Sequence, residues 1–353
     1  MISREYFGDM PDGQQVEQFS LTNEQGVTVE ILNLGGIIRR WLVPTSKQGP
    51  VDIVLGFDTL ADYLADDSYL GTVVGRYANR IAKGRFAIGD VTYKVDVNQA
   101  GNCLHGGSDG FHHRVWHSEI ASNGNEPVLI LSLTSQDGDQ GFPGQIDVKV
   151  RYTLSAQNML RVEYFALSDK DTVFNPTQHS YFNLAGHDGG KIHDQQIQVF
   201  ASHFTPTDTN AIPTGEIADV SNTPFDLRQL TSIALPLSDP HEQIKIANGL
   251  DHNWCLNAYR PGMRKAALAA IAFEPASGRK LTVSTTMPGM QVYTGNFLSA
   301  EVTRKNAAVY PPNQAFCFES QYYPDAPNQL NFPSPALKAG EEFYSVTEFT
   351  IEF

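Results

Sequence analysis

QIDVKVRYTLSAQNMLRVEYFALS, residues 145–168, is the stretch that decides the fold class. Apolar and polar residues alternate along both of its ends, and turn-forming residues separate them. Alternation with a period of two is typical of a β-strand with one buried face. The stretch therefore predicts extended strands that follow one another after a short turn.

The same pattern continues in both directions from this stretch. Residues 27–44 alternate, break at Gly35–Gly36 and resume, while residues 85–95 predict a hairpin that turns at Gly89–Asp90. Residues 126–135 and 191–206 are also strand-like. Residues 264–286 contain alanines that favour a helix, but the turn PASG between two apolar runs favours a hairpin, which we predict. Helical periodicity is scarce, and DTLADYLADD (58–67) is its best short example.

Many short strands with frequent turns indicate an all-β protein in which antiparallel sheets stack as a sandwich. Glycine and proline are spread throughout, and no linker rich in serine and glycine divides the chain. We therefore expect a single domain over residues 1–353.

Composition excludes several classes of partner. The chain has 353 residues, 41% of them hydrophobic, and a formal net charge of -14 without a long basic run. Binding to nucleic acid or to an anionic membrane needs clustered cations, so we expect neither. No apolar run approaches the roughly 18 residues of a membrane span, and the N-terminal residues lack the apolar core of a signal peptide. We expect a monomer in the cytoplasm.

Cysteine and histidine spacing argues against disulfides and metals. Cys103, Cys255 and Cys317 are odd in number and far apart, which indicates neither a disulfide framework nor a thiolate zinc site. HHRVWH (112–117) contains histidines four residues apart, but it lies in strand-like sequence without a carboxylate at a helical offset. We expect no metal and no cofactor, and the glycines form no phosphate-binding loop.

NPTQHSYFNLAGH (175–187) concentrates a histidine, aromatic rings and amides. In an extended chain, residues i and i+2 share a face, so His179, Tyr181 and Asn183 would point one way and Phe182 the other. A lone histidine near aromatic rings is more often a hydrogen-bonded structural residue than a catalyst. The stretch alone leaves both interpretations open.

Three other stretches repeat this arrangement. QAFCFESQYYPDAPNQ (314–329) would place Cys317 and Glu319 on the face opposite its core phenylalanines, where an unpaired buried charge is costly. GLDHNWCL (249–256) offers Asp251, and MPGMQVYTGNF (287–297) offers Gln291 and Tyr293. Glu319 as an edge-strand surface carboxylate and Asp251 as a turn cap remain the structural alternatives.

Together these stretches resemble the aldose 1-epimerase (galactose mutarotase) family. The matching segments include GTVVGRYANRIAKGRF, NCLHGG, NPTQHSYFNLAGH, GLDHNWCL, MPGMQVYTGNF and ESQYYPDAPNQLNFPSPALKAGEEF. The resemblance implies a large antiparallel β-sandwich of the galactose mutarotase-like supersandwich class, with an open sugar-binding cleft. It also implies interconversion of the α and β anomers of galactose and glucose without a cofactor.

The resemblance assigns roles to residues of this chain. It implies His179 as the acid to the ring oxygen and Glu319 as the base to the C1 hydroxyl. It places sugar contacts on these residues: Asn79, Arg80, His105, Tyr181, Asp251 and Gln291. GFHHRVW (110–116) and the loop before Glu319 depart from the family pattern, which bears on loop conformation and sugar preference.

Reference pKa values, about 4.3 for glutamate and 6.5 for histidine, suggest that Glu319 is ionised at neutral pH. Nearby carboxylates would then hold His179 protonated.

Two other functions stay open. A glycosidase would need two carboxylates that flank the bond, for which Asp251 and Glu319 are the candidate pair. A non-catalytic sugar-binding module would use the same groups without proton transfer.

Overall fold

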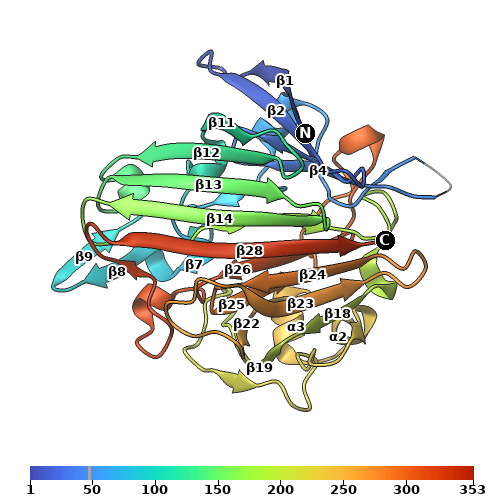
Figure 1. The fold of residues 1–353 in the computed structure, drawn as a ribbon. Coiled ribbons are helices and arrows are strands. Elements are labelled where there is room, and N and C mark those ends of the chain that lie inside the picture. The colour runs from blue at the N-terminus through green and yellow to red at the C-terminus, as the bar shows by residue number, and fades with distance from the viewer. Residues whose placement is uncertain (47–48) are drawn as a thin grey trace.

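A nine-stranded antiparallel sheet forms one layer of the computed structural model, which describes residues 1–46 and 49–353 (Figure 1). Its strands in spatial order are β11 (His117–Ser122), β12 (Val128–Ser135), β13 (Ile146–Leu154), β14 (Met159–Ser168), β28 (Glu342–Glu352), β24 (Lys280–Thr285), β23 (Ala267–Phe273), β18 (Gln196–Val199) and β21 (Thr231–Ser232). The stretch that decided the fold class is the pair β13–β14. Ile146, Val148 and Val150 alternate inward with exposed polar residues, as predicted.

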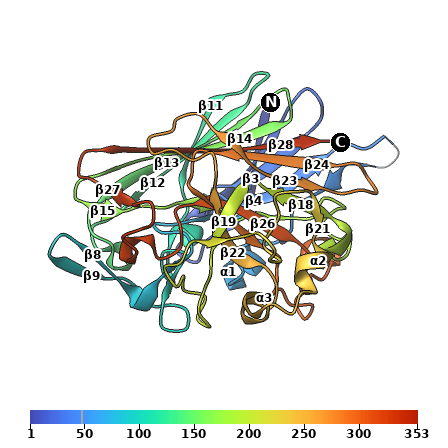
Figure 2. The same ribbon diagram turned by 90° about the horizontal axis from the view of Figure 1, so that it is seen from below.

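A six-stranded antiparallel sheet lies beneath the first layer (Figure 2). Its strands in spatial order are β17 (Tyr181–Phe182), β26 (Phe316–Gln321), β25 (Gly289–Tyr293), β22 (Asp251–Leu256), β19 (Ala201–Thr205) and β20 (Ala218–Asp219). Phe182 of this sheet packs against Phe349 of β28, with ring centroids 5.8 Å apart. One continuous apolar core therefore joins the two sheets, and burial of this surface stabilises the sandwich.

The N-terminal residues add a five-stranded sheet: β1 (Ile2–Asp9), β2 (Gln15–Thr22), β3 (Thr28–Leu32), β4 (Ile38–Val43) and β5 (Val51–Asp52). Trp41 of β4 reaches both Phe182 and Phe349, with ring centroids 6.0 and 6.3 Å away. Gly35 and Gly36 have positive φ between β3 and β4, which glycine adopts at low cost, so the predicted break is confirmed.

Short elements complete the fold. Paired strands are β6 (Val73–Val74) with β16 (Thr177–Gln178), β7 (Arg80–Ile81) with β10 (Cys103–Leu104), β8 (Arg85–Ile88) with β9 (Val91–Lys94), and β15 (Thr172–Val173) with β27 (Ala336–Leu337). Helices are α1 (Leu60–Ala65), α2 (Ala234–Leu237) and α3 (Glu242–Ala247). Single 3-10 turns are η1 (Ala82–Gly84), η2 (Phe111–His113), η3 (Asp139–Gly141), η4 (Ile192–Asp194), η5 (Lys305–Ala307) and η6 (Ala326–Asn328).

Most element predictions agree with the structure. The hairpins at 85–95 and 264–286 are confirmed as β8–β9 and β23–β24. The predicted helix at 58–67 is α1, which begins after Thr59, whose hydroxyl oxygen accepts the backbone N–H of Asp62. Helices α2 and α3 have no counterpart in the sequence prediction. Among the described residues, no helix has the length and apolar character that a membrane span requires.

Candidate active site

Strand register gathers the predicted site residues into rows across the six-stranded sheet. Tyr181 pairs with Cys317, Cys317 with Tyr293, and Tyr293 with Asp251. These four residues therefore form one row over β17, β26, β25 and β22. Side chains in such a row share a face of the sheet, so residues remote in sequence become neighbours.

The next row holds the two proposed catalytic groups. Glu319 pairs with Gln291 of β25. Continuing the β17–β26 register by two residues places His179 opposite Glu319, and His179 Nε2 lies 3.6 Å from Glu319 Oε2. The His179 backbone is held on both sides, because its N–H donates to Thr72 O and its C=O accepts the N–H of Gly71. The strand-face prediction is therefore confirmed for Tyr181 with His179 and for Cys317 with Glu319.

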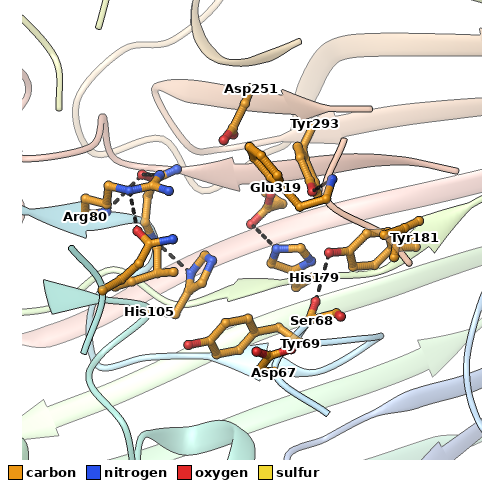
Figure 3. A pocket seen from close by; sticks show the side chains of 15 residues that line it. Asp67, Ser68, Tyr69, Arg80, His105, His179, Tyr181, Asp251, Tyr293 and Glu319 are labelled. Carbon is orange, nitrogen blue, oxygen red and sulfur yellow. Dashed lines mark hydrogen bonds and ion pairs between the residues drawn. The ribbon is translucent and has the colours of Figure 1, made fainter. Parts of the chain in front are cut away.

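Loops on the other side close a pocket of about 270 Å³ over these rows (Figure 3). Residues singled out from the sequence that line it are Asn79, Arg80, His105, His179, Tyr181, Asp251, Tyr293 and Glu319. Its remaining lining residues are Asp67, Ser68, Tyr69, Gln99, Leu104, Phe297 and Leu298. Polar groups thus converge on a small cavity with aromatic walls, which is the usual composition of a small-molecule site.

Gln291 is a predicted substrate contact that lies beside the pocket and is absent from its lining. Its Nε2 donates to Asp251 Oδ1 at 2.7 Å, and its own Oε1 accepts from Gln321 Nε2 at 3.2 Å. Asn183, expected on the face of His179, donates instead to the carbonyls of Gly190 and Gln314. Gln291 therefore holds the Asp251 carboxylate in place, while Asn183 supports the fold.

Segment 67–69 is the part of the site that the sequence did not predict. It follows α1, more than a hundred residues before His179 in the chain, and brings Asp67, Ser68 and Tyr69 to the pocket. The Tyr181 hydroxyl donates to Ser68 O at 2.8 Å and fixes this segment against the sheet. The Tyr69 ring stacks on His179 at 6.1 Å and meets His105 edge-on at 4.6 Å. No spacing pattern could have indicated these contacts, because they are tertiary.

Glu319 has a buried carboxyl group, and one of its two oxygens, Oε2, lacks a hydrogen-bond partner in the described part of the chain. Burial raises the pKa of Glu319 well above its usual value, Asp251 raises the pKa further, and Arg80 lowers it. The expectation that Glu319 has a pKa near that of a surface glutamate is therefore wrong for the unliganded site.

His179 departs from expectation in the opposite direction. Burial lowers its pKa to about 4, because the charged imidazolium is poorly solvated inside the pocket. The expectation that carboxylates hold it protonated is therefore wrong for the unliganded protein. Burial thus disfavours the charged form of both groups and favours a protonated Glu319 beside a neutral His179.

Asn79 and His105 fix each other through reciprocal hydrogen bonds. The backbone N–H of Asn79 donates to His105 Nδ1 at 3.1 Å, and the backbone N–H of His105 donates to Asn79 O at 3.0 Å. Because Nδ1 accepts the hydrogen bond from Asn79 and burial lowers the pKa of His105, the neutral ring carries its proton on Nε2. His105 is thus set as a hydrogen-bond donor.

The same tautomer bears on metal binding. His105, His179 and Glu319 form the one group in the described part of the chain whose ligand atoms lie close enough together, within 4.8 Å, to hold an ion. A metal needs the lone pair of an imidazole nitrogen, but His105 Nδ1 is occupied and Nε2 bears the proton. His112, His113 and His117 do not assemble into such a group.

Arg80 and Asp251 supply opposite charges to the pocket wall (Figure 3). Arg80 Nε donates to Gln99 Oε1 at 2.9 Å and Nη1 donates to Asn79 Oδ1 at 3.4 Å, so Nη2 and the second hydrogen of Nη1 remain for a ligand. Asp251 keeps free acceptor capacity beyond its bond to Gln291. Phe297 lies at the rim of the pocket and is 68% exposed. The site can therefore bind a polar ring-shaped molecule and exchange a proton with it.

Comparison with known proteins fits this geometry. A family model described as Aldose 1-epimerase matches residues 17–350. The chain belongs to the aldose 1-epimerase family. It is 42% identical over 349 residues to a galactose mutarotase from Bos taurus, covering 99% of this chain and 98% of that one. It is 35% identical over 341 residues to an aldose 1-epimerase from Escherichia coli (strain K12), covering 96% of each.

Solved structures of aldose epimerases share the fold. The crystal structure of a galactose 1-epimerase from Lactobacillus acidophilus NCFM superposes with a TM-score of 0.87 and 27% identity, covering 100% of this chain and 98% of that one. An aldose epimerase homologue from C. elegans gives 0.85 and 26%, covering 99% of both chains. The predicted galactose mutarotase-like β-sandwich is confirmed. The protein is an isomerase, so the glycosidase and passive-binder interpretations are set aside.

Proposed function

We propose that this aldose 1-epimerase interconverts the α and β anomers of galactose and glucose, with His179 and Glu319 as its acid and base. The observation that carries the proposal is the convergence of His179 Nε2 and the unpartnered Glu319 Oε2, 3.6 Å apart, on one wall of the pocket. The relatives named galactose mutarotase support galactose as a substrate.

Ring opening requires two proton transfers on one hemiacetal. Glu319 takes the proton of the C1 hydroxyl, the C1–O5 bond breaks, and its electron pair goes to O5, which receives a proton from His179 Nε2. C1 becomes an aldehyde and rotates about C1–C2. Closure on the other face reverses both transfers and restores the enzyme. Each positioned transfer contributes about 10²–10⁴-fold in rate.

The proton count of the pair suits this cycle. The reactive form has an ionised Glu319 and a protonated His179. It contains the same number of protons as the resting form, in which burial favours a protonated Glu319 and a neutral His179. One proton that moves between the two groups therefore prepares the site. No exchange with solvent is needed at neutral pH.

The remaining wall would hold the sugar. Arg80 and the Nε2–H of His105 donate to hydroxyl oxygens, and Asp251 accepts from hydroxyl groups while Gln291 holds it. Asn79 fixes the tautomer of His105. The Tyr181 hydroxyl already donates to Ser68 O, so Tyr181 offers its ring to the apolar face of the sugar.

Polarimetry tests the proposal directly. Fresh α-galactose and α-glucose are followed to anomeric equilibrium with wild-type protein, with Glu319→Gln protein and without protein. We expect wild type alone to accelerate both approaches to equilibrium. The proposal fails if wild type leaves both rates at the uncatalysed value, and the proposed substrate range is too wide if one sugar alone responds.

A further inference from the structure

Both ring nitrogens of His179 face the same strand. Cys317 and Glu319 lie two residues apart on β26 and share a face. Cys317 Sγ lies 3.7 Å from His179 Nδ1, and Glu319 Oε2 lies 3.6 Å from Nε2. Cys317 is fully buried, so no solvent competes for this contact.

The proposed proton transfer gives the two nitrogens different duties. Nε2 exchanges a proton with the sugar, so the neutral form of His179 must keep its remaining proton on Nδ1. An N–H on Nδ1 needs an acceptor. In the described part of the chain, the polar side-chain atom within hydrogen-bond distance of Nδ1 is the sulfur of Cys317.

Within the described part of the chain, the other titratable side chains around the ring make no hydrogen bond to Nδ1. Tyr69 and His105, both in loops, contact the His179 ring. Tyr181 of β17 stacks on this ring, and Tyr293 of β25 contacts it edge-on. Glu319 faces the opposite nitrogen. The thiol is therefore positioned to set the orientation of the ring.

Sulfur differs from the acceptors that usually support a working histidine. A carboxylate or a carbonyl at the second nitrogen raises the basicity of the imidazole. A backbone hydrogen bond of His179 itself raises its pKa in this way, but burial lowers the pKa by more. A thiol is a weak acceptor and stabilises the imidazolium little. Burial and the nearby carboxylates Glu319 and Asp251 raise the pKa of Cys317, so the thiol stays neutral and does not become a thiolate that would hold the proton.

We propose that Cys317 is a positioning residue whose sulfur accepts the Nδ1–H of His179, directs Nε2 toward Glu319 and the sugar, and leaves the imidazolium ready to release its proton. This inference rests on the proposed function of the pair. It goes beyond that function by naming the group that sets the tautomer and the acidity of His179.

Nitrogen-15 NMR tests the tautomer without any sugar. Two-bond proton–nitrogen spectra of imidazole-labelled wild type are compared with those of His179→Asn protein, whose missing signals assign His179. At neutral pH we expect Nδ1 to carry the proton. In Cys317→Ala protein we expect a mixture of tautomers. An unprotonated Nδ1 in the wild type overturns the proposal even if the enzyme is fully active.

Kinetics of matched variants test the consequence. Cys317→Ala should lower kcat about fivefold, as expected for one lost hydrogen bond, with KM for galactose little changed. Cys317→Ser should recover part of the lost kcat, because it supplies an acceptor for Nδ1–H, and should move the acidic limb of kcat/KM to higher pH, because a hydroxyl oxygen is the stronger acceptor. Cys255→Ala is the control, since Cys255 is another buried strand thiol outside the pocket.

Equal loss of kcat in the Cys317→Ala and Cys255→Ala proteins would reduce Cys317 to a packing residue and overturn the proposal. If wild type itself fails to accelerate mutarotation, the proposed function is wrong, while the NMR result still decides whether the sulfur accepts the Nδ1–H. The two failures are therefore distinguishable.

Discussion

Glu319 Oε2 faces His179 Nε2 at 3.6 Å and, within the described part of the chain, has no hydrogen-bond partner. An unsatisfied buried oxygen costs stability, because water can no longer solvate it. Such a cost is typical of sites that are built for a ligand rather than for the resting fold. The pair thus connects the chemistry of the site to the stability of the protein.

Replacing either member of the pair should remove most of the activity. Glu319→Gln and His179→Asn keep approximate size and polarity but delete a proton-transfer group. We expect kcat to fall by at least about 100-fold in each variant, within the range for general acid–base catalysis. Polarimetry measures the rate, and circular dichroism confirms folding. A folded variant with nearly wild-type kcat would show that the assigned role is wrong.

Glu319→Gln should also stabilise the protein at neutral and alkaline pH. The folded-state pKa of Glu319 is raised, so the folded state retains a proton that the unfolded state loses near pH 4.3. Stability therefore falls as pH rises from there through the folded pKa. Glutamine has no such proton. The variant should melt at a higher temperature than wild type at about pH 8 and at nearly the same temperature at about pH 3.5.

Thermal unfolding at both pH values checks this stability difference. An Asp58→Asn protein serves as control, because Asp58 is a partly exposed carboxylate that lies outside the pocket. A lower melting temperature for Glu319→Gln at alkaline pH would mean that the carboxylate contributes to the resting fold.

Groups that hold the sugar should act mainly on binding. In the proposed site, alanine at Arg80, His105 or Asp251 would remove a hydrogen bond to a sugar hydroxyl, which costs about 1–3 kcal/mol, with the larger loss for a charged group. We expect a raised KM in each variant, with kcat lowered where ring placement suffers. Initial rates over a galactose series measure both constants. Wild-type constants in all three variants would place the sugar elsewhere.

Treatment with a chelator should leave activity intact. The tautomer of His105, set by the backbone N–H of Asn79, removes one of the three nearby ligands from a metal's reach. Activity is measured before and after exhaustive dialysis against a chelator. Loss of activity that zinc then restores would show that His105 gives up its bond to Asn79.

The sequence predicted the faces of individual strands but not the alignment between strands. The spacing of two residues correctly placed Cys317 with Glu319 and His179 with Tyr181. It could not show that Glu319 lies opposite His179, because register between β17 and β26 is set by pairing across more than a hundred residues. For the same reason, segment 67–69 remained outside the predicted site.

The sequence also predicted the wrong pKa values for the two groups. Reference pKa values describe groups in water, whereas His179 and Glu319 are both almost fully buried. Burial penalises whichever form is charged, so it moves the pKa values of an acid and a base in opposite directions. That reversal depends on packing, which residue types and spacing do not reveal.

The pH dependence of kcat/KM should reflect the single proton shared by the pair. Below the lowered pKa of His179, about 4, a second proton enters and Glu319 can no longer act as base. Above the raised pKa of Glu319, the proton that the pair shares is lost to solvent, and His179 has no proton on Nε2 to donate. Activity should therefore stay level through the usual histidine pKa of about 6.5. The limbs belong to the pair rather than to single residues.

Initial rates from about pH 4 to pH 9, corrected for the acid- and base-catalysed background at each pH, measure this profile. The profile expected from reference pKa values differs, since it would show His179 deprotonating and activity falling just above pH 6.5. A basic limb at that position would mean that the pair already loses its shared proton there, against the level profile expected. A level profile through neutral pH would instead support one mobile proton between His179 and Glu319 as the working state of the site.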